Sequence, residues 1–231
     1  MFASRAANAD RVTLYHRRML LEIRAVSPFF KNGFLLGCER TRDAVIVDPG
    51  DEVAELIDIV RARDLRVNAI LLTHGHVDHV AGVAKARAEL DAPIYLHEED
   101  AFLYRTAVTQ AELFGMRIDA PPPVDRFYDL QQPIGFGNCA IRVHHVPGHS
   151  PGSVCLQLEG AEMDRTRLFV GDTLFDGSIG RTDLPGGSYD TLIRSIKQVL
   201  LAFEDESEVY PGHGPATTIG KERRTNPFLQ G

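Results

Sequence analysis

Several residue types are scarce in this sequence, and each shortage excludes a class of protein. The chain has no tryptophan and three widely spaced cysteines, Cys38, Cys139 and Cys155. An odd number of cysteines without paired spacing is not typical of a disulfide scaffold or a CxxC zinc site. We therefore expect buried thiols and a reducing cytoplasm as the location. No apolar run approaches the ~18 residues of a transmembrane helix, so no membrane partner is expected.

Positive charge is also in short supply. The 25 lysines and arginines are outnumbered by 32 aspartates and glutamates, which gives a net charge of −7. Binding nucleic acid without sequence preference needs a basic surface, so nucleic acid is not an expected partner. The first 20 residues contain arginines but no apolar signal-peptide core. We expect residues 1–20 to be a flexible leader, with a transit peptide as the alternative, and residues 21–231 to form a single domain.

The hydrophobic pattern predicts strands first and then alternating strands and helices, an order repeated along the chain. We expect one helix that buries Val53, Leu56, Ile57 and Val60. Two further helices are expected over residues 80–90 and 189–203. Expected strands cover residues 21–26, 34–38, 44–47, 67–72, 93–96, 140–146, 153–158, 167–170 and 208–210. This order predicts an α+β fold in which two mixed sheets lie face to face between outer helices.

The segment 98–137 is weakly periodic and contains three consecutive prolines, at positions 121–123. Such long connections are often functional. Within this segment, we expect residues 98–125 to form a lid, with Phe102, Tyr104, Phe114, Met116 and the prolines lining or covering the substrate entrance. The alternative is a helix that packs on the sheet.

The segment from Thr73 to His79 reads T-H-G-H-V-D-H and carries the clearest chemical signal in the chain. It follows a predicted buried strand and precedes a helix. In an extended turn alternate residues point the same way, so His74 and His76 can share one metal ion. Asp78 and His79 then project toward a second position nearby. Imidazole and carboxylate groups suit zinc, iron or manganese.

Further ligands must come from elsewhere in the chain. His149 and His213 each follow a strand and a Pro-Gly pair, which suits the rigid presentation of a ligand. Asp172 ends a buried strand, and its two oxygens could bridge two metal ions. Asp48 also ends a strand, where it is a turn residue or accepts a hydrogen bond from a ligand imidazole. The remaining histidines are expected in the leader (His16), at the surface or beside the ligands (His97), and packed or exposed on a strand (His144 and His145).

In chain order these residues resemble the metallo-β-lactamase superfamily, whose fold is an αββα sandwich. The resemblance to its glyoxalase II members places His74, His76 and His149 on one metal ion and Asp78, His79 and His213 on the other. Asp172 would bridge the two ions. The stretches G-D-T-L-F (171–175), G-R-T-D (180–183) and P-G-H-G-P (211–215) are similar to short bacterial glyoxalase II-like hydrolases, as is the tail 221–228.

One departure concerns the substrate. Where full-length glyoxalase II has a lysine and a tyrosine for the thiol carrier, this chain has Arg181 and Asp183. We expect Arg181 to bind a substrate carboxylate through a bidentate contact. The alternative is a salt bridge with Asp183 that only fixes the loop.

The resemblance implies a hydrolase with two divalent metal ions, of which zinc is preferred over iron or manganese. Its expected substrate is a small thioester, most simply an S-acylglutathione such as S-lactoylglutathione. A metal-held hydroxide would attack the thioester, and Asp78 would orient it as the catalytic carboxylate. The alternative is a persulfide dioxygenase with one iron ion on His74, His149 and Asp172, acting on glutathione persulfide. The sequence leaves a homo-oligomer open.

Overall fold

The computed structural model describes residues 11–16, 19–160 and 163–230. Strand β1 (Arg11–His16) pairs antiparallel with β2 (Met19–Arg24). Strand pairing thus includes residues 11–16 and 19–20 of the expected leader. The sequence R-V-T-L at residues 11–14 alternates polar and apolar residues, which is the pattern of a strand. The rest of the predicted leader, residues 1–10 and 17–18, lies outside the described residues.

The first sheet contains seven strands in sequence order, β1 to β7. After β2 come β3 (Gly33–Cys38), β4 (Asp43–Val47), β5 (Arg66–Leu71), β6 (Ile94–Leu96) and β7 (Arg126–Phe127). Pairing is antiparallel from β1 to β4 and parallel from β4 to β7, so the sheet is mixed.

The second sheet contains six strands in the order β15-β14-β11-β10-β9-β8. Their bounds are β8 (Ile134–Phe136), β9 (Cys139–His145), β10 (Val154–Gly160), β11 (Arg167–Gly171), β14 (Glu208–Pro211) and β15 (Thr217–Thr218). The β11–β14 pair is parallel and the others are antiparallel, so this sheet is mixed as well. Strands β12 (Leu174–Phe175) and β13 (Ser178–Ile179) form a separate hairpin.

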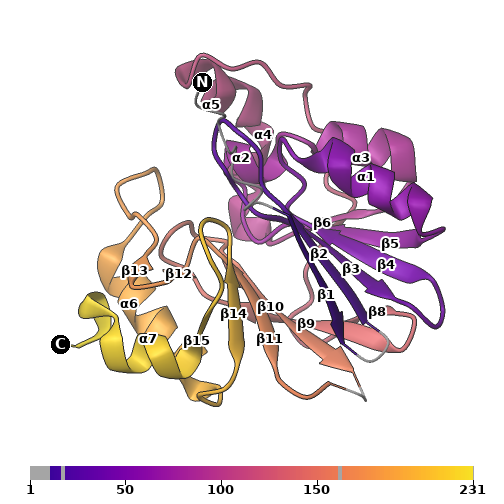
Figure 1. The fold of residues 1–231 in the computed structure, drawn as a ribbon. Helices are drawn as coiled ribbons and strands as arrows, with labels where there is room; N and C mark the ends of the chain where they lie inside the picture. Colours follow the sequence, from indigo (N-terminus) through magenta and orange to yellow (C-terminus); the bar gives the residue numbers. More distant parts are fainter. Residues whose placement is uncertain (1–10, 17–18, 161–162, 231) are drawn as a thin grey trace, which may run out of the picture.

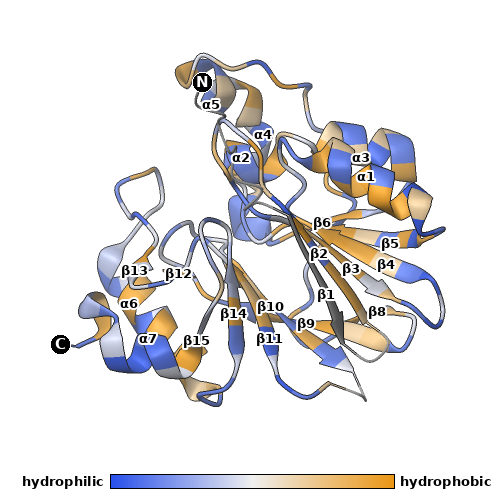
Figure 2. Ribbon diagram, in the orientation of Figure 1, coloured by the Kyte–Doolittle hydropathy of each residue, from blue (hydrophilic) through white to orange (hydrophobic). Residues whose placement is uncertain are grey.

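Helices cover the outer face of each sheet, which produces the predicted αββα sandwich (Figure 1). Helices α1 (Val53–Ala62) and α3 (Val83–Leu90) pack on the first sheet. Helix α6 (Tyr189–Gln198) and α7 (Ile219–Thr225) pack on the second. Single turns of 3-10 helix occur at Glu98–Asp100, Leu200–Ala202 and Pro227–Leu229. Hydrophobic residues on these helices pack against hydrophobic residues of the strands, as the orange segments in Figure 2 show.

Short helices gather at one edge of the first sheet, namely α2 (Val77–Val80), α4 (Ala101–Arg105) and α5 (Ala107–Leu113). The helix predicted over residues 80–90 is broken between α2 and α3. Gly82 lies at the break, where a Cβ atom would come within 2.3 Å of the Gly50 carbonyl oxygen. The loop after β4 thus packs directly against this turn. No helix among the described residues is long and apolar enough to cross a membrane.

The layer between the sheets is held by three aromatic rings. Phe34 on β3 meets Phe169 on β11 edge to face, with ring centroids 5.0 Å apart. Phe169 in turn stacks on Tyr210 of β14 at 5.2 Å. All three are buried. Such packing fixes the separation of the sheets, and with it the separation of the loops at their ends.

Candidate metal centre

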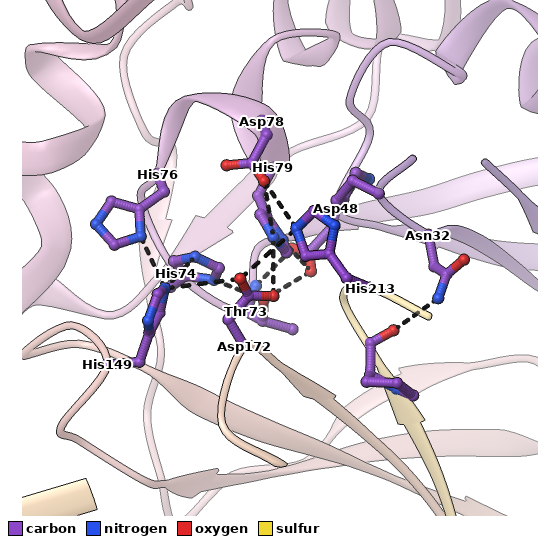
Figure 3. A network of polar contacts seen from close by, with 12 residues as sticks. Asn32, Asp48, Thr73, His74, His76, Asp78, His79, His149, Asp172 and His213 are labelled. Carbon is purple, nitrogen blue, oxygen red and sulfur yellow. Dashed lines mark hydrogen bonds and ion pairs between the residues drawn. The ribbon is translucent and has the colours of Figure 1, made fainter. Parts of the chain in front are cut away.

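All seven predicted ligand side chains meet at one edge of the sandwich, between the two sheets (Figure 3). Those of the 73–79 segment follow β5 in the first sheet. The others follow β9, β11 and β14 in the second. They form two sets, a histidine-only set of His74, His76 and His149 and an acidic set of Asp78, His79, Asp172 and His213.

In the histidine-only set, ring nitrogens of His74 and His149 face one another without a proton to share. His149 Nδ1 donates to the Arg181 carbonyl at 2.8 Å, which leaves the Nε2 lone pair free. The Thr73 hydroxyl donates to Asp48, so it accepts from His74 Nδ1 at 3.1 Å and frees His74 Nε2. The Nε2 atoms of His74 and His149 lie 3.2 Å apart, and their facing lone pairs repel unless a cation lies between them. His76 Nδ1 lies 2.9 Å from His149 Nε2 and can donate its proton there, which leaves the lone pair of His76 on Nε2.

The acidic set is built around two carboxylates. His213 Nε2 lies 3.0 Å from Asp78 Oδ2 and 3.6 Å from Asp172 Oδ2. His79 Nε2 lies 3.3 Å from Asp172 Oδ1. Asp172 Oδ2 also lies 3.9 Å from His149 Nε2. Asp172 is therefore within reach of both sets.

Buried atoms without partners give an independent indication of a cation. Among the described residues, His76 Nε2, His79 Nε2 and Asp172 Oδ1 are buried and have no hydrogen-bond partner. Such groups are costly unless something satisfies them. Imidazole nitrogens and carboxylate oxygens are ligands for zinc, iron and manganese, so the residues present fit divalent metal ions.

The two sets differ in charge. Burial, together with the neighbouring His149, lowers the pKa of His76 to about 4, so this imidazole stays neutral at pH 7. Burial alone would also lower the pKa of His79, but the carboxylates of Asp78, Asp48 and Asp172 raise it to about 10. Positive charge is thus favoured in the acidic set, and a metal ion would take the place of the proton.

Asp48 orients the His79 ring of the acidic set. Its Oδ2 atom accepts from His79 Nδ1 at 2.9 Å, which is the hydrogen bond to an imidazole suggested by the sequence. The same carboxylate accepts from the backbone N–H of Thr73 at 2.7 Å and from its hydroxyl at 2.6 Å. Asp48 is fully buried and directly follows strand β4. Its hydrogen bonds tie the end of one strand to the histidine segment after the next.

A loop near the N-terminal end of the fold holds the His213 loop in place, which the sequence did not indicate. The Asn32 side chain donates to the carbonyls of Pro211 at 3.0 Å and Gly214 at 2.8 Å. Its backbone N–H donates to Gly212 at 2.6 Å, and Lys31 forms a β-bridge with His213. These contacts join residues about 180 positions apart in the chain.

Arg181 lies beside the acidic set, but its charge is already matched. Its guanidinium donates two hydrogen bonds of 2.7 Å to Asp183 and lowers the pKa of that carboxyl to about 2. The salt bridge suggested as the alternative role is therefore present. The Arg181 carbonyl has a role that the sequence did not reveal, because it orients His149.

A cavity of about 420 Å³ opens next to the acidic set. Asp172 and His213 form one wall of the cavity. The rest of its lining is Phe175, Asp176, Ser178, Arg181, Gly214 and Pro215. A small substrate could enter here and reach the Asp172 carboxylate and the His213 ring.

The 98–125 segment matches the lid prediction only in part. Helix α5 lies against α2, and Gln110 accepts from the Val77 N–H at 3.2 Å, so the segment is on the metal side. Phe102 and Phe114 are exposed. Tyr104 is not a lining residue, because it is buried in the core and donates to the Pro122 carbonyl at 2.7 Å.

A third group of candidate ligands, His97, Glu99 and His145, is separate from these two sets. Its two imidazole rings stack nearly parallel, with centroids 4.1 Å apart and planes at 12°. Ring lone pairs lie in the ring plane, so stacked rings do not converge on one ion. His145 Nε2 also donates to the Pro151 carbonyl at 2.8 Å.

The αββα fold with two ligand sets at one edge defines a metal centre of the metallo-β-lactamase type. A family model of the metallo-beta-lactamase superfamily matches residues 26–213, and the chain belongs to this superfamily. The fold implies divalent metal ions. The resemblance stated from the sequence is confirmed.

Among named relatives, hydroxyacylglutathione hydrolase GloC of Haemophilus influenzae is 40% identical over 217 residues, covering 91% of this chain and 98% of the relative. The crystal structure of the B3 metallo-beta-lactamase BLEG-1 superposes with a TM-score of 0.82 at 37% identity, covering 91% of this chain and all of that one. The di-iron-bound form of TTHA1623 gives a TM-score of 0.78 at 40% identity, with 94% and 100% covered. These relatives place the chain among hydrolase-like members of the superfamily.

Proposed function

We propose that the protein is a binuclear metal-dependent hydrolase of thioesters, with an S-acylglutathione such as S-lactoylglutathione as substrate. The observation that carries the proposal is the position of Asp172, within 4 Å of ring nitrogens in both ligand sets. The hydroxyacylglutathione hydrolase relative supports the choice of thioester. Zinc is the proposed metal. The three cysteines are free thiols, which agrees with a cytoplasmic location.

In this proposal the histidine-only set holds one ion and the acidic set the other, with Asp172 between them. Bound divalent cations supply a water molecule of lowered pKa and draw charge from a carbonyl oxygen. Asp78 belongs to the acidic set, and its Oδ2 atom lies 3.0 Å from His213 Nε2. Its carboxylate accepts a hydrogen bond from the attacking water and so directs the oxygen lone pair at the thioester carbon.

The leaving group makes few demands on the protein. A thiol has a pKa of about 8.5, so a thiolate departs without a strong general acid. The cavity beside His213 carries Phe175 and Pro215, which offer apolar contact to part of the substrate. The site therefore needs to position the carbonyl group rather than protonate the sulfur atom.

His213→Ala tests the two-metal arrangement. The substitution removes a ligand from the acidic set alone, so bound zinc should fall from about two ions per chain to about one, and most thioesterase activity should be lost. Metal content after dialysis and hydrolysis of S-lactoylglutathione are the measurements. His144→Ala is the matched control, because His144 bonds Gln157 on the neighbouring strand, away from the site. Unchanged zinc content in His213→Ala would contradict the binuclear proposal.

Arg181→Ala tests recognition of a substrate carboxylate. The Arg181 side chain is 58% exposed and lines the cavity, so it can exchange Asp183 for a substrate carboxylate. KM should then rise about tenfold for a thioester that bears a carboxylate and much less for a neutral one. An equal change in KM for both thioesters would assign Arg181 to the loop alone.

A second candidate function is the iron-dependent persulfide dioxygenase. It is favoured by the spacing of one trio, since His149 Nε2 lies 3.2 Å from His74 Nε2 and 3.9 Å from Asp172 Oδ2. Two histidines and a carboxylate are the ligands of many non-haem iron oxygenases. Parallel assays separate the two reactions. Thioester loss without oxygen uptake supports the hydrolase, whereas oxygen uptake with glutathione persulfide supports the dioxygenase.

A further inference from the structure

A buried carboxylate outside both ligand sets lies between the two loops that carry the histidine-only set. Asp100 ends the 3-10 turn after β6 and is fully buried. It belongs to neither set of candidate ligands. The sequence alone does not distinguish it, because it is one of three consecutive acidic residues, Glu98 to Asp100, with no motif around it.

Asp100 accepts hydrogen bonds from both loops at once. Its Oδ2 atom accepts from the backbone N–H of Gly75, between His74 and His76, at 2.8 Å. The same oxygen accepts from the Ser150 hydroxyl, next to His149, at 2.7 Å. Its Oδ1 atom accepts from the Gly152 N–H at 2.6 Å.

The direction of these hydrogen bonds requires an acceptor at this position. The Ser150 N–H donates to Ser153 Oγ at 3.1 Å, and the two serine hydroxyls lie 2.7 Å apart. Since the Ser150 hydroxyl donates to Asp100, the Ser153 hydroxyl donates to Ser150. Three donors thus converge on one carboxylate, and none of its partners needs a proton from it.

The loops also pack against Asp100 without free space. A Cβ atom on Gly152 would come within 2.7 Å of the Asp100 backbone nitrogen and 2.8 Å of its Cβ. A Cβ atom on Gly75 would come within 3.0 Å of the Asp100 carbonyl oxygen. Any shift of this carboxylate therefore moves the backbone beside His74, His76 and His149 together.

We propose that Asp100 is a positioning residue that sets the spacing of the histidine-only set, and so the metal affinity of that set alone. The inference rests on the proposed metal centre. Asp100 is not itself a metal ligand in this proposal. It fixes the distance between two loops whose ring nitrogens must converge on one ion, as a hydrogen-bonded group behind a ligand does in other metal sites.

The test measures zinc affinity of each set separately, by competition with a chromophoric chelator in the whole protein. The His213→Ala background leaves the histidine-only set intact, and the His149→Ala background leaves the acidic set. Asp100→Asn keeps the shape but places an amide group among three donors. It should weaken zinc binding about tenfold or more in the first background and less than about twofold in the second. Asp125→Asn is the matched control, because Asp125 also accepts from a backbone N–H near β6, that of Ile94, but lies away from the site.

The outcomes separate the inference from the proposed function. If His213→Ala alone binds no zinc, the proposed metal centre fails. If it binds zinc and Asp100→Asn weakens both sets equally, or neither, Asp100 has only a general structural role and the inference fails. Should Asp100→Asn not fold by circular dichroism, Ser150→Ala decides the question. It removes one of the three donors and should weaken only the histidine-only set, by a smaller factor.

Discussion

Asp172→Asn should abolish most of the activity and lower the zinc content from about two ions per chain to below one. The substitution keeps the size of the side chain but removes its negative charge, and an amide oxygen is a weaker ligand than a carboxylate. Because Asp172 reaches ring nitrogens of both sets, both ions should be lost more easily. Ligands are more critical than the groups behind them, whose loss costs about 10–100-fold, so activity should fall at least about 100-fold.

The measurements are zinc content after dialysis and thioester hydrolysis at saturating substrate. Asp176→Asn makes the same chemical change in the same cavity but pairs with Lys221 rather than with either set. It should keep both zinc ions. If Asp172→Asn retained two ions and near-normal activity, the bridging role of Asp172 would be wrong.

Lys31→Met should cause the largest loss of stability of any single change considered. Lys31 and Glu52 form a buried ion pair of 2.7 Å, with side chains 2% and 1% exposed. The lysine Nζ also donates to the Asp48 carbonyl. Methionine fills a similar volume but leaves the Glu52 carboxylate buried without its cation, which costs about 3–5 kcal/mol of the free energy of unfolding.

Urea denaturation with a chelator present measures this loss without a contribution from bound metal. The double variant Lys31→Met/Glu52→Gln removes both charges and should recover part of the stability. With the Glu52→Gln single variant added, the four proteins form a double-mutant cycle that gives the coupling between the two side chains. A loss below about 1 kcal/mol in the single variant would show that water reaches Glu52.

The layers and the candidate ligand residues could be predicted from local patterns in the sequence, whereas the division of the ligands into two sets was implied by the resemblance to glyoxalase II. Strands and helices have different hydrophobic periods, and the T-H-G-H-V-D-H segment places three histidines within six residues. His149, Asp172 and His213 each follow a strand, and strand ends of a sandwich meet at a common edge. The wrong assignment of Tyr104 has a local cause too, since an aromatic residue in a weakly periodic segment reads equally well as core or as lining.

What the sequence could not predict depends on distant contacts. Asp100 holds Gly75 and Gly152, which lie 25 and 52 positions away. Arg181 acts on His149 through a backbone carbonyl, which every residue type possesses. Asn32 holds the His213 loop although it lies about 180 positions earlier in the chain. None of these roles alters the composition or periodicity of its own segment, so no local pattern reports them.

The positions of the ligands along the chain set the order in which the two ligand sets can be completed during synthesis. A ribosome adds about 5–20 residues per second, so His149 is made several seconds before His213. The histidine-only set therefore has all of its side chains while the acidic set still lacks Asp172 and His213. Asn32 is made about 180 residues before its partners Pro211 and Gly214. The His213 loop is therefore fixed by a contact between distant parts of the chain, which forms slowly because a long loop has to close.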